Sequence, residues 1–321
     1  MIDAAWQPVR TALDHGKIPG AVLGWVGVDG QRALRFGGLA QREPEPAVMR
    51  PDTWFDLASL TKVVFTTTAI LRLVAAGRIG LDDPLVLAIP DLRQYDMAAA
   101  ERKLTFRQCL SHQTHLPAVE PLYTYGQDPQ TLRAFILQRE WRAGPPVYSD
   151  INFLLLGIAI ERLTGNPLDQ QPLPTGLTFH PQFGDCAATE HCRWRGHVMR
   201  GAVHDENAFA MGGAAGHAGL FGTADGLLNF AATLLRGDDA ALAGIAAPQS
   251  PTRGLGWELR HDGWSGGAAT LGHTGFTGTG LWLDFTRGRA WTLLTNRVHP
   301  SRHFDSGIIA LRRAVSAAFS V

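Results

Sequence analysis

The chain of 321 residues is 45% hydrophobic and 18% charged, and its 29 basic and 29 acidic residues leave no formal net charge. This composition is typical of a folded globular protein and excludes disorder as the dominant state. Because there is no basic excess, it also excludes an electrostatic footprint for nucleic acid or for an anionic lipid surface.

The first predicted element is an amphipathic helix over residues 2–16, with Ile2, Trp6, Val9 and Leu13 near helical spacing. This polar segment lacks the basic and apolar regions of an export signal, and no later run reaches the roughly 18 apolar residues that span a bilayer. The three cysteines are an odd number, which is typical of free thiols. We therefore expect a cytoplasmic protein without a membrane partner, and the sequence favours no particular oligomeric state.

Strand-like runs follow at residues 21–28 and 32–40, and the Asp29-Gly30 dipeptide between them predicts a hairpin. Residues 59–76 predict a buried helix that ends at Gly77. As far as about residue 245 the pattern is mostly helices and loops. Helices are predicted over 104–112, 131–140, 151–165 and 223–237, and a loop-like stretch over 166–200. Strands return over 255–260, 270–285 and 290–297, before a last helix over 301–319.

Strands therefore come from both ends of the chain, and a helical block lies between them. This order predicts an α+β fold, in which an antiparallel sheet built from both chain ends is flanked by helices and carries a mostly helical insertion. We expect one domain over residues 1–321. Its sheet subdomain would comprise approximately 1–58 and 246–321, and its helical subdomain approximately 59–245.

The candidate nucleophile is Ser59, which begins the S-x-x-K sequence Ser59-Leu60-Thr61-Lys62 at the start of a predicted helix. Three residues of helix place both side chains on one face, where an amine that can lose its proton can activate a hydroxyl. Only three of the 29 basic residues are Lys, so roughly 0.08 such matches are expected by chance with nine Ser. A capping Ser followed by a solvated Lys is the structural alternative, and the scarcity of Lys favours the catalytic interpretation.

At these residues the sequence resembles the serine β-lactamase and penicillin-recognising superfamily, and is most similar to its class C β-lactamase-like and carboxylesterase-like serine hydrolases. The resemblance covers nearly the whole chain. The segment FDLASLTKVV matches the nucleophile motif, VYSDINFLLLGIAIERLTG resembles the second, Tyr-x-Asn motif, and LGHTGFTGTGLW resembles the third, Lys/His-Thr-Gly motif. The segments LDDPLVLAIPDL, LTFRQCLSHQTHLP and AAGHAGLFGTADGLLNF also look like parts of this family.

The resemblance implies that Ser59 is acylated and that Lys62 and Tyr148 share the general-base and proton-shuttle work. The backbone N–H groups of Ser59 and Phe276 would form the oxyanion hole. Three residues would line the opposite wall of the cleft: His273, Thr274 and Gly275. It implies no metal or organic cofactor, and a small-molecule or peptide acyl compound as substrate.

Two residues depart from the family pattern. Asp150 stands where the second motif has Asn, and a carboxylate accepts hydrogen bonds but donates none. It could pair with Lys62 and hold it charged, which would transfer the base role to Tyr148. His273 stands where β-lactam-directed members commonly have Lys, and neutral imidazole is a poor clamp for a β-lactam carboxylate. His273 could instead hydrogen-bond the Tyr148 oxygen. Both departures favour an esterase or amidase over an efficient β-lactamase.

A polar segment holds further candidates, for the substrate side of the cleft or for a metal: His204, Asp205, Glu206, Asn207 and His217. A loop held by side-chain caps is the structural alternative, and the ligand spacing matches no standard metal site. A subset of the superfamily with a similar HDEN segment resembles bacterial amidases that act on muropeptides. Cys186 and Cys192 lie near two His residues, but buried free thiols are the simpler interpretation.

Three functions thus remain open besides the esterase or amidase. The first is a non-hydrolytic, penicillin-binding or acyl-sensing homologue, in which Asp150 and His273 prevent turnover. The second is a muropeptide amidase or peptidase of the same superfamily. The third is a Cys/His metal-binding protein with an accidental S-x-x-K sequence.

Overall fold

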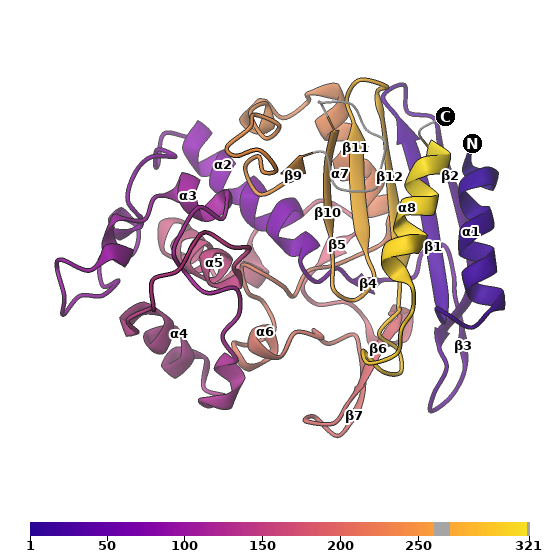
Figure 1. Cartoon of the computed structure of the whole chain (residues 1–321), viewed down its shortest axis with the longest axis horizontal. Coiled ribbons are helices and arrows are strands. Elements are labelled where there is room, and N and C mark those ends of the chain that lie inside the picture. Colours follow the sequence, from indigo (N-terminus) through magenta and orange to yellow (C-terminus); the bar gives the residue numbers. More distant parts are fainter. Residues whose placement is uncertain (260–269, 320–321) are drawn as a thin grey trace.

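The computed structural model describes residues 1–259 and 270–319. At its centre is a seven-stranded antiparallel sheet with the strand order β3-β2-β1-β12-β11-β10-β9 (Figure 1). Its strands are β1 Gly20–Gly27, β2 Arg32–Gln41, β3 Ala47–Val48, β9 Glu258–Leu259, β10 Thr270–Thr274, β11 Gly280–Asp284 and β12 Arg289–Thr295. Strand β1 pairs with β12, so the two chain ends meet in the middle of the sheet. The predicted α+β fold with a sheet from both chain ends is confirmed.

Helices cover both faces of this sheet. On one face lie α1, Ile2–Asp14, and α8, Ile308–Phe319, side by side (Figure 1). Strand alternation sends Leu23 into the core under these helices, with Trp6, Trp291 and Phe319, while its neighbour Val22 joins the larger core on the other face. There the sheet contacts α7, Ala224–Arg236. Each such buried apolar side chain contributes about 1.5–3 kcal/mol to folding.

The remaining helices form the part of the molecule that lies beyond the β9 edge of the sheet in Figure 1. These helices are α2 Thr68–Ala75, α3 Phe106–Leu110, α4 Pro129–Gln138, α5 Asp150–Thr164 and α6 Glu206–Ala210. Every residue from Ile151 to Ile160 is buried, as expected of a central helix with no solvent face. Helix α5 ends at Gly165, whose φ of 77° requires the left-handed conformation. In the described residues, no helix has the length and apolar character needed to cross a membrane.

Short elements connect these layers. A three-stranded sheet has the order β4-β8-β5, with β4 Phe55–Asp56, β8 Phe221–Gly222 and β5 Leu177–Thr178. Short 3-10 turns lie at Leu85–Leu87, Ala100–Lys103, Leu122–Thr124, Leu168–Gln170, Phe183–Asp185 and Ala240–Leu242. Strand β4 leads directly into the segment that carries Ser59.

Four predicted elements differ in the structure. The predicted helix over 59–76 opens as a π-helix over Lys62–Thr67, and only then continues as α2. The loop-like stretch over 166–200 contains a hairpin of β6, Ala188–Cys192, and β7, His197–Arg200. The last helix begins at Ile308 instead of residue 301. The predicted strand over 255–260 shortens to β9, and its last position, 260, lies outside the described residues.

Candidate active site

The segment that carries Ser59 is a strained turn between β4 and the π-helix. Ala58 has a φ of 47°, a left-handed conformation that residues with a Cβ rarely adopt. The turn is held from within, because the Ala58 N–H donates to Asp56 Oδ1 at 2.8 Å. Asp56 is buried and its other carboxylate oxygen accepts the His204 N–H at 2.6 Å. Backbone strain of this kind is typical of functional sites, where the surrounding contacts maintain it.

The turn between β10 and β11 packs directly against the Ser59 turn. Thr277 Oγ1 donates to the carbonyl of Asp56 at 2.7 Å, and Thr279 Oγ1 donates to the carbonyl of Leu57 at 3.1 Å. Gly275 is required by this approach, since a Cβ there would lie 2.5 Å from the Leu57 carbonyl oxygen. The backbone of Phe276, the next residue, is thereby placed next to the candidate nucleophile.

Lys62 is fully buried and its amine faces three oxygen atoms. Nζ donates to Ser59 Oγ at 2.9 Å and to the His217 carbonyl at 3.1 Å, and lies 2.8 Å from Asp150 Oδ1. Burial lowers the pKa of Lys62, but the negative charge of Asp150 outweighs this effect and the net pKa is raised. The amine is therefore an ammonium group that donates to Ser59. The pairing of Asp150 with Lys62 that the sequence suggested is present.

Tyr148 lies beside the same two residues. The Lys62 ammonium lies 5.1 Å from the centre of its ring, and Ser59 and Lys62 are both close enough to lower the pKa of its hydroxyl. Burial raises the pKa of the phenol, and the Asp150 carboxylate adds to this effect. The positive charge of Lys62 lowers the pKa of Tyr148, but this effect is smaller than the increase caused by burial. The Tyr148 phenol is consequently protonated at neutral pH.

His112 is a neighbour of Tyr148 that sequence reasoning missed. Its Nδ1 accepts the Ser149 N–H at 3.0 Å, and its ring centre lies 4.5 Å from that of Tyr148. Burial lowers its pKa far below the ordinary value, and nearby Arg253 and Lys62 lower it further. A neutral ring that accepts at Nδ1 carries its proton on Nε2. No motif singles out this residue, and its φ of 55° at the end of α3 is visible only in the structure.

His273 lies on β10, and its ring centre is 5.9 Å from that of Tyr148. Burial lowers its pKa to about 3, with Arg253 and Lys62 assisting and Glu258 opposing. The imidazole is neutral, and Nδ1 bonds the Thr274 carbonyl at 3.0 Å. Its Nε2 has no hydrogen-bond partner in the described part of the chain, so the suggested bond to the Tyr148 oxygen is absent from this structure.

These residues surround a cavity of about 480 Å³, here called the catalytic pocket. It is lined by Ala58, Ser59, Val119, Tyr148, Asp150, His204, Asp205, Glu206, Ala218, Arg253, Glu258, His273, Thr274, Phe276 and Arg302. Two predicted site residues do not line this pocket, Lys62 and Gly275. Lys62 is buried behind Ser59, and Gly275 allows the β10–β11 turn to pack against the Ser59 turn. Arg253 was missed by sequence reasoning. Its guanidinium lies 3.3 Å from Glu258 and 5.2 Å from the centre of the Tyr148 ring.

The HDEN segment is both part of the pocket wall and an internally bonded loop. Asp205 caps α6 by accepting the Ala208 N–H at 2.8 Å, and it bonds His217 Nε2 at 2.9 Å. Asn207 Nδ2 donates to the Glu120 carbonyl at 2.8 Å. In the described residues, no three His, Cys, Asp or Glu side chains gather as a metal centre would require. Cys109, Cys186 and Cys192 are free and buried, as predicted.

The chain is similar to known proteins both in sequence and in fold. Residues 7–315 match the family described as Beta-lactamase. The chain is 32% identical to an N-acetylmuramyl-L-alanine amidase of Bacillus subtilis (strain 168), over 79% of this chain and 70% of the relative. It is 30% identical to a putative D-alanyl-D-alanine carboxypeptidase of Escherichia coli (strain K12), over 83% and 74%.

A class C β-lactamase from Rhodobacter sphaeroides has a similar solved structure, with a TM-score of 0.77 and 19% sequence identity. The match covers 99% of each chain. At this identity the likeness concerns the fold.

Proposed function

The chain belongs to the β-lactamase family, and on that premise we propose that it is a serine hydrolase that cleaves an ester or amide bond through an acyl-enzyme on Ser59. One observation carries the proposal. Ser59 Oγ lies 2.9 Å from Lys62 Nζ at the wall of a 480 Å³ pocket that Tyr148 also lines. A nucleophile next to proton-transfer groups and an open cavity is the arrangement that acyl transfer needs.

In the acylation step, Tyr148 reacts as the phenolate, the form that has already lost the phenol proton and that makes up a small fraction at neutral pH. Ser59 Oγ forms a bond to the substrate carbonyl carbon, and its proton passes to this phenolate oxygen. Tyr148 is the acceptor because Lys62, held as ammonium by Asp150, has no free electron pair. The carbonyl oxygen gains negative charge, which the N–H groups of Ser59 and Phe276 and the nearby ammonium stabilise. When the bond to the leaving group breaks, that group takes the proton from Tyr148.

Deacylation repeats these steps with water in place of Ser59. A water molecule gives a proton to Tyr148 as its oxygen bonds the acyl carbon, and Ser59 Oγ leaves and recovers the proton. Lys62 keeps its charge throughout and orients Ser59 Oγ, while His112 supports the backbone that follows Tyr148. Every transferred proton is thus accounted for by Ser59, Tyr148, water and the leaving group.

The pocket favours esters or amides over β-lactams. His273 is neutral, with a pKa of about 3, and so supplies no cation at the third motif to hold a β-lactam carboxylate. A muropeptide amidase or peptidase is the second candidate, and the similarity to an N-acetylmuramyl-L-alanine amidase favours it. An acyl-sensing protein is the third, favoured by the ion pair that keeps Lys62 from acting as a base.

The test is a panel of p-nitrophenyl esters, a chromogenic cephalosporin and a muropeptide, each with the wild type and with Ser59→Ala. We expect steady turnover of esters or amides by the wild type, at least 1,000-fold above the variant, as is typical when a nucleophile is removed. Equal turnover by Ser59→Ala would refute the mechanism. A burst of product without a steady state would identify the sensor, and rapid cephalosporin hydrolysis would refute the conclusion drawn from His273.

A further inference from the structure

The turn between β10 and β11 carries the Phe276 N–H, one of the two groups that stabilise the oxyanion in the proposed mechanism. The turn is closed by its own backbone, because the Gly275 N–H donates to the Thr279 carbonyl at 2.9 Å and the Gly278 N–H donates to the Gly275 carbonyl at 3.1 Å. In the described residues, neither the Phe276 N–H nor the Ser59 N–H donates to an acceptor. Both groups are therefore free to bind a substrate oxygen.

A side chain of the last helix bonds the same turn. Arg312, on α8, donates through a single atom, Nη2, to the Gly275 carbonyl at 2.9 Å and to the Thr279 carbonyl at 2.8 Å. Arg312 does not line the catalytic pocket, whereas Phe276 does. The Arg312 Nε has neither solvent contact nor a hydrogen-bond partner in the described residues. Within that part of the chain, both hydrogen bonds of Arg312 therefore go to the β10–β11 turn.

The Arg312 guanidinium keeps its charge at neutral pH, although its surroundings disfavour it. Burial lowers the pKa of Arg312 to about 10, with the charge of Arg297 acting in the same direction and that of Glu258 opposing. Burying a cation costs free energy unless polar groups bind it, and here two backbone carbonyls do so. Hydrogen bonds from a charged donor are roughly twice as strong as neutral ones. Arg312 therefore holds the turn more firmly than the backbone bonds of the turn alone.

The Gly275 carbonyl and the Phe276 N–H belong to one peptide bond, which is trans. In a trans peptide these two groups lie in one plane and point in opposite directions. A bond that fixes the direction of the Gly275 carbonyl therefore also fixes the direction of the Phe276 N–H. Gly275 has no side chain to restrict rotation of this peptide plane, so the restraint must come from outside. A cation on the carbonyl also polarises the amide and strengthens the N–H as a donor.

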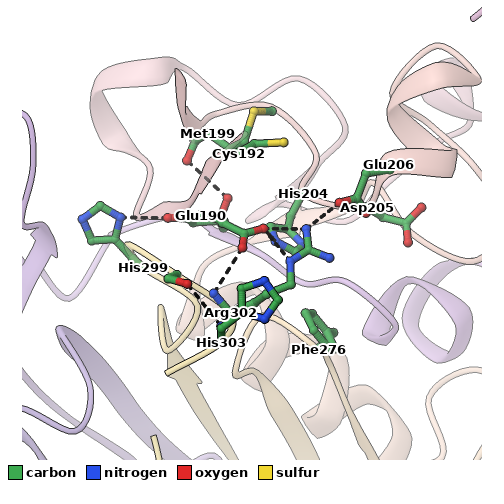
Figure 2. A network of polar contacts seen from close by, with 12 residues as sticks. Glu190, Cys192, Met199, His204, Asp205, Glu206, Phe276, His299, Arg302 and His303 are labelled. Atoms are coloured by element: carbon green, nitrogen blue, oxygen red, sulfur yellow. Dashed lines mark hydrogen bonds and ion pairs between the residues drawn. The ribbon is translucent and has the colours of Figure 1, made fainter. Parts of the chain in front are cut away.

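The rest of Phe276 is held by other residues. Arg297 Nε donates to the Phe276 carbonyl at 2.9 Å, and its guanidinium lies 4.7 Å from the ring centre. Figure 2 shows the Phe276 ring in one cluster with His204 and Arg302, each 5.7 Å from the ring centre. These contacts fix the side chain and the carbonyl of Phe276. They leave the preceding peptide bond to Arg312 and the turn itself.

We propose that Arg312 is a positioning residue for the oxyanion hole, which orients the peptide between Gly275 and Phe276 so that the Phe276 N–H points toward the substrate carbonyl oxygen. This inference rests on the proposed hydrolase function and adds to it a residue outside the catalytic pocket. Its effect on the reaction passes through Phe276. The competing interpretation is a purely structural role, in which Arg312 stabilises the turn without setting the direction of the N–H.

The kinetic test uses Arg312→Met, which keeps an unbranched side chain but removes both hydrogen bonds, and Arg312→Lys, which keeps the charge. With p-nitrophenyl acetate we expect Arg312→Met to lower kcat about tenfold to 100-fold, part of the roughly 100-fold to 1,000-fold lost when an oxyanion-hole donor is removed. KM should change less than about threefold, because the bond to the oxygen is strongest in the transition state. Arg312→Lys should lose less than fivefold in kcat.

A second substrate separates positioning from stability. In O-(p-nitrophenyl) thionoacetate, sulfur replaces the carbonyl oxygen, and sulfur is a weak hydrogen-bond acceptor. We therefore expect the ratio of kcat/KM for the oxygen ester to that for the thionoester to fall at least threefold in Arg312→Met. Arg313→Met is the matched control, because Arg313 is the next residue of α8 and is exposed. It should leave the ratio unchanged.

An unchanged ratio in Arg312→Met would overturn the proposal, even with a lowered Tm, because Arg312 would then support only the fold. If Arg312→Met does not fold, Arg312→Gln replaces it, and the same fall in the ratio is expected. An unchanged ratio in that variant would equally overturn the proposal.

A nuclear magnetic resonance measurement tests the placement without any turnover. Gly275-Phe276 is the only Gly-Phe pair in the sequence, so labelling with carbonyl-¹³C glycine and ¹⁵N phenylalanine selects the signal of this one peptide bond. The N–H residual dipolar coupling of that signal reports the direction of the bond. We expect it to change in Arg312→Met and to stay the same in Arg313→Met. The other phenylalanine amides should keep their couplings, which controls for the fold.

An unchanged coupling would overturn the proposal even if Ser59-dependent ester hydrolysis is present. Absence of that hydrolysis in the wild type would refute the proposed hydrolase instead. The coupling would still decide whether Arg312 sets the direction of the Phe276 N–H, so the two failures are distinguishable.

Discussion

The Lys62 ammonium lies 2.8 Å from the Asp150 carboxylate, and this ion pair determines which group next to Ser59 can accept a proton. A buried amine would ordinarily lose its proton readily, since burial disfavours the charged form. Asp150 reverses this tendency for Lys62, and it also raises the pKa of Tyr148. One carboxylate at the position of the family Asn therefore raises the pKa of both candidate bases. In the mechanism that we propose, Lys62 stays charged and Tyr148 accepts the proton.

Asp150→Asn should move the pH dependence of hydrolysis toward lower pH. Without the carboxylate, burial lowers the pKa of Lys62, and the pKa of Tyr148 falls as well. We expect the rising limb of kcat/KM against pH to shift down by at least one pH unit. Asp150→Glu, which keeps the charge, should shift it by less than half a unit. An unmoved limb in Asp150→Asn would show that the ion pair does not control the base.

The wild-type pH profile itself is a second prediction. The pKa of the Tyr148 phenol is raised above its ordinary value of 10 by burial, so at neutral pH only a small fraction is phenolate. Each increase of one pH unit below that pKa raises the phenolate fraction about tenfold. We therefore expect kcat/KM for an amide substrate to keep rising up to at least pH 9.

Tyr148→Phe should abolish this rise of kcat/KM with pH. It should also lower kcat by about 100-fold to 10,000-fold, the usual contribution of a general base. Tyr125→Phe is the control, because Tyr125 is exposed and its hydroxyl bonds Glu120 at 2.7 Å, away from the catalytic pocket. A plateau reached between pH 6 and 7.5 would contradict Tyr148 as the acceptor.

Gly275→Ala tests the placement of the oxyanion hole. The added Cβ would lie 2.5 Å from the Leu57 carbonyl oxygen, so the β10–β11 turn must move away from the Ser59 turn. Loss of one oxyanion-hole donor costs about 100-fold to 1,000-fold in kcat. We expect a loss of that size with KM changed less than threefold. Gly244→Ala, where nothing lies within 4 Å of the new Cβ, should be neutral. Full activity in Gly275→Ala would exclude Phe276 from the hole.

The parts of the site that could be predicted from sequence are those that depend on local spacing. Ser59 and Lys62 are three residues apart, on the turn and on the start of the helical segment that follows it, and Asp150 follows Tyr148 by two. A short pattern therefore places each pair. His112 and Arg253 reach Tyr148 from distant segments, through contacts that only the tertiary fold creates. No local pattern distinguishes them from an ordinary buried histidine or a surface arginine.

The missed hairpin has a similar cause. Strands β6 and β7 are short and carry charged residues such as Glu190, so they lack the alternation that identifies a half-buried strand. Glu190 occupies a buried position of this hairpin, where its carboxylate bonds Arg302 and His204 from two other segments of the chain. The polarity that made this stretch resemble a loop belongs to a buried network of hydrogen bonds among Glu190, Arg302 and His204.

The π-helix was missed because a pattern of six residues is too short to distinguish the 3.6-residue turn of an α-helix from the wider turn of a π-helix. Thr67 and Thr68 are the residues from which the π-helix could have been predicted. Their hydroxyl groups donate to the carbonyls of Lys62 and Val63, five residues back, at 2.8 and 3.4 Å. The five-residue offset is that of the π-helix hydrogen bond, and such segments are frequent at functional sites. The wider turn begins at Lys62 itself, so it affects the position of the amine relative to Ser59.

Thr67→Val should therefore impair catalysis more than its small change in shape suggests. It removes the hydroxyl that bonds the Lys62 carbonyl, which should lower the free energy of unfolding by about 1 kcal/mol. Because small misplacements of a catalytic group reduce rates strongly, we also expect kcat to fall about tenfold. Chemical denaturation and steady-state kinetics measure the two effects. Thr68→Val, which removes the longer bond at 3.4 Å, is the matched control and should lose less than twofold in kcat. If both variants lose equal activity, the Lys62 carbonyl bond has no special role in placing the amine.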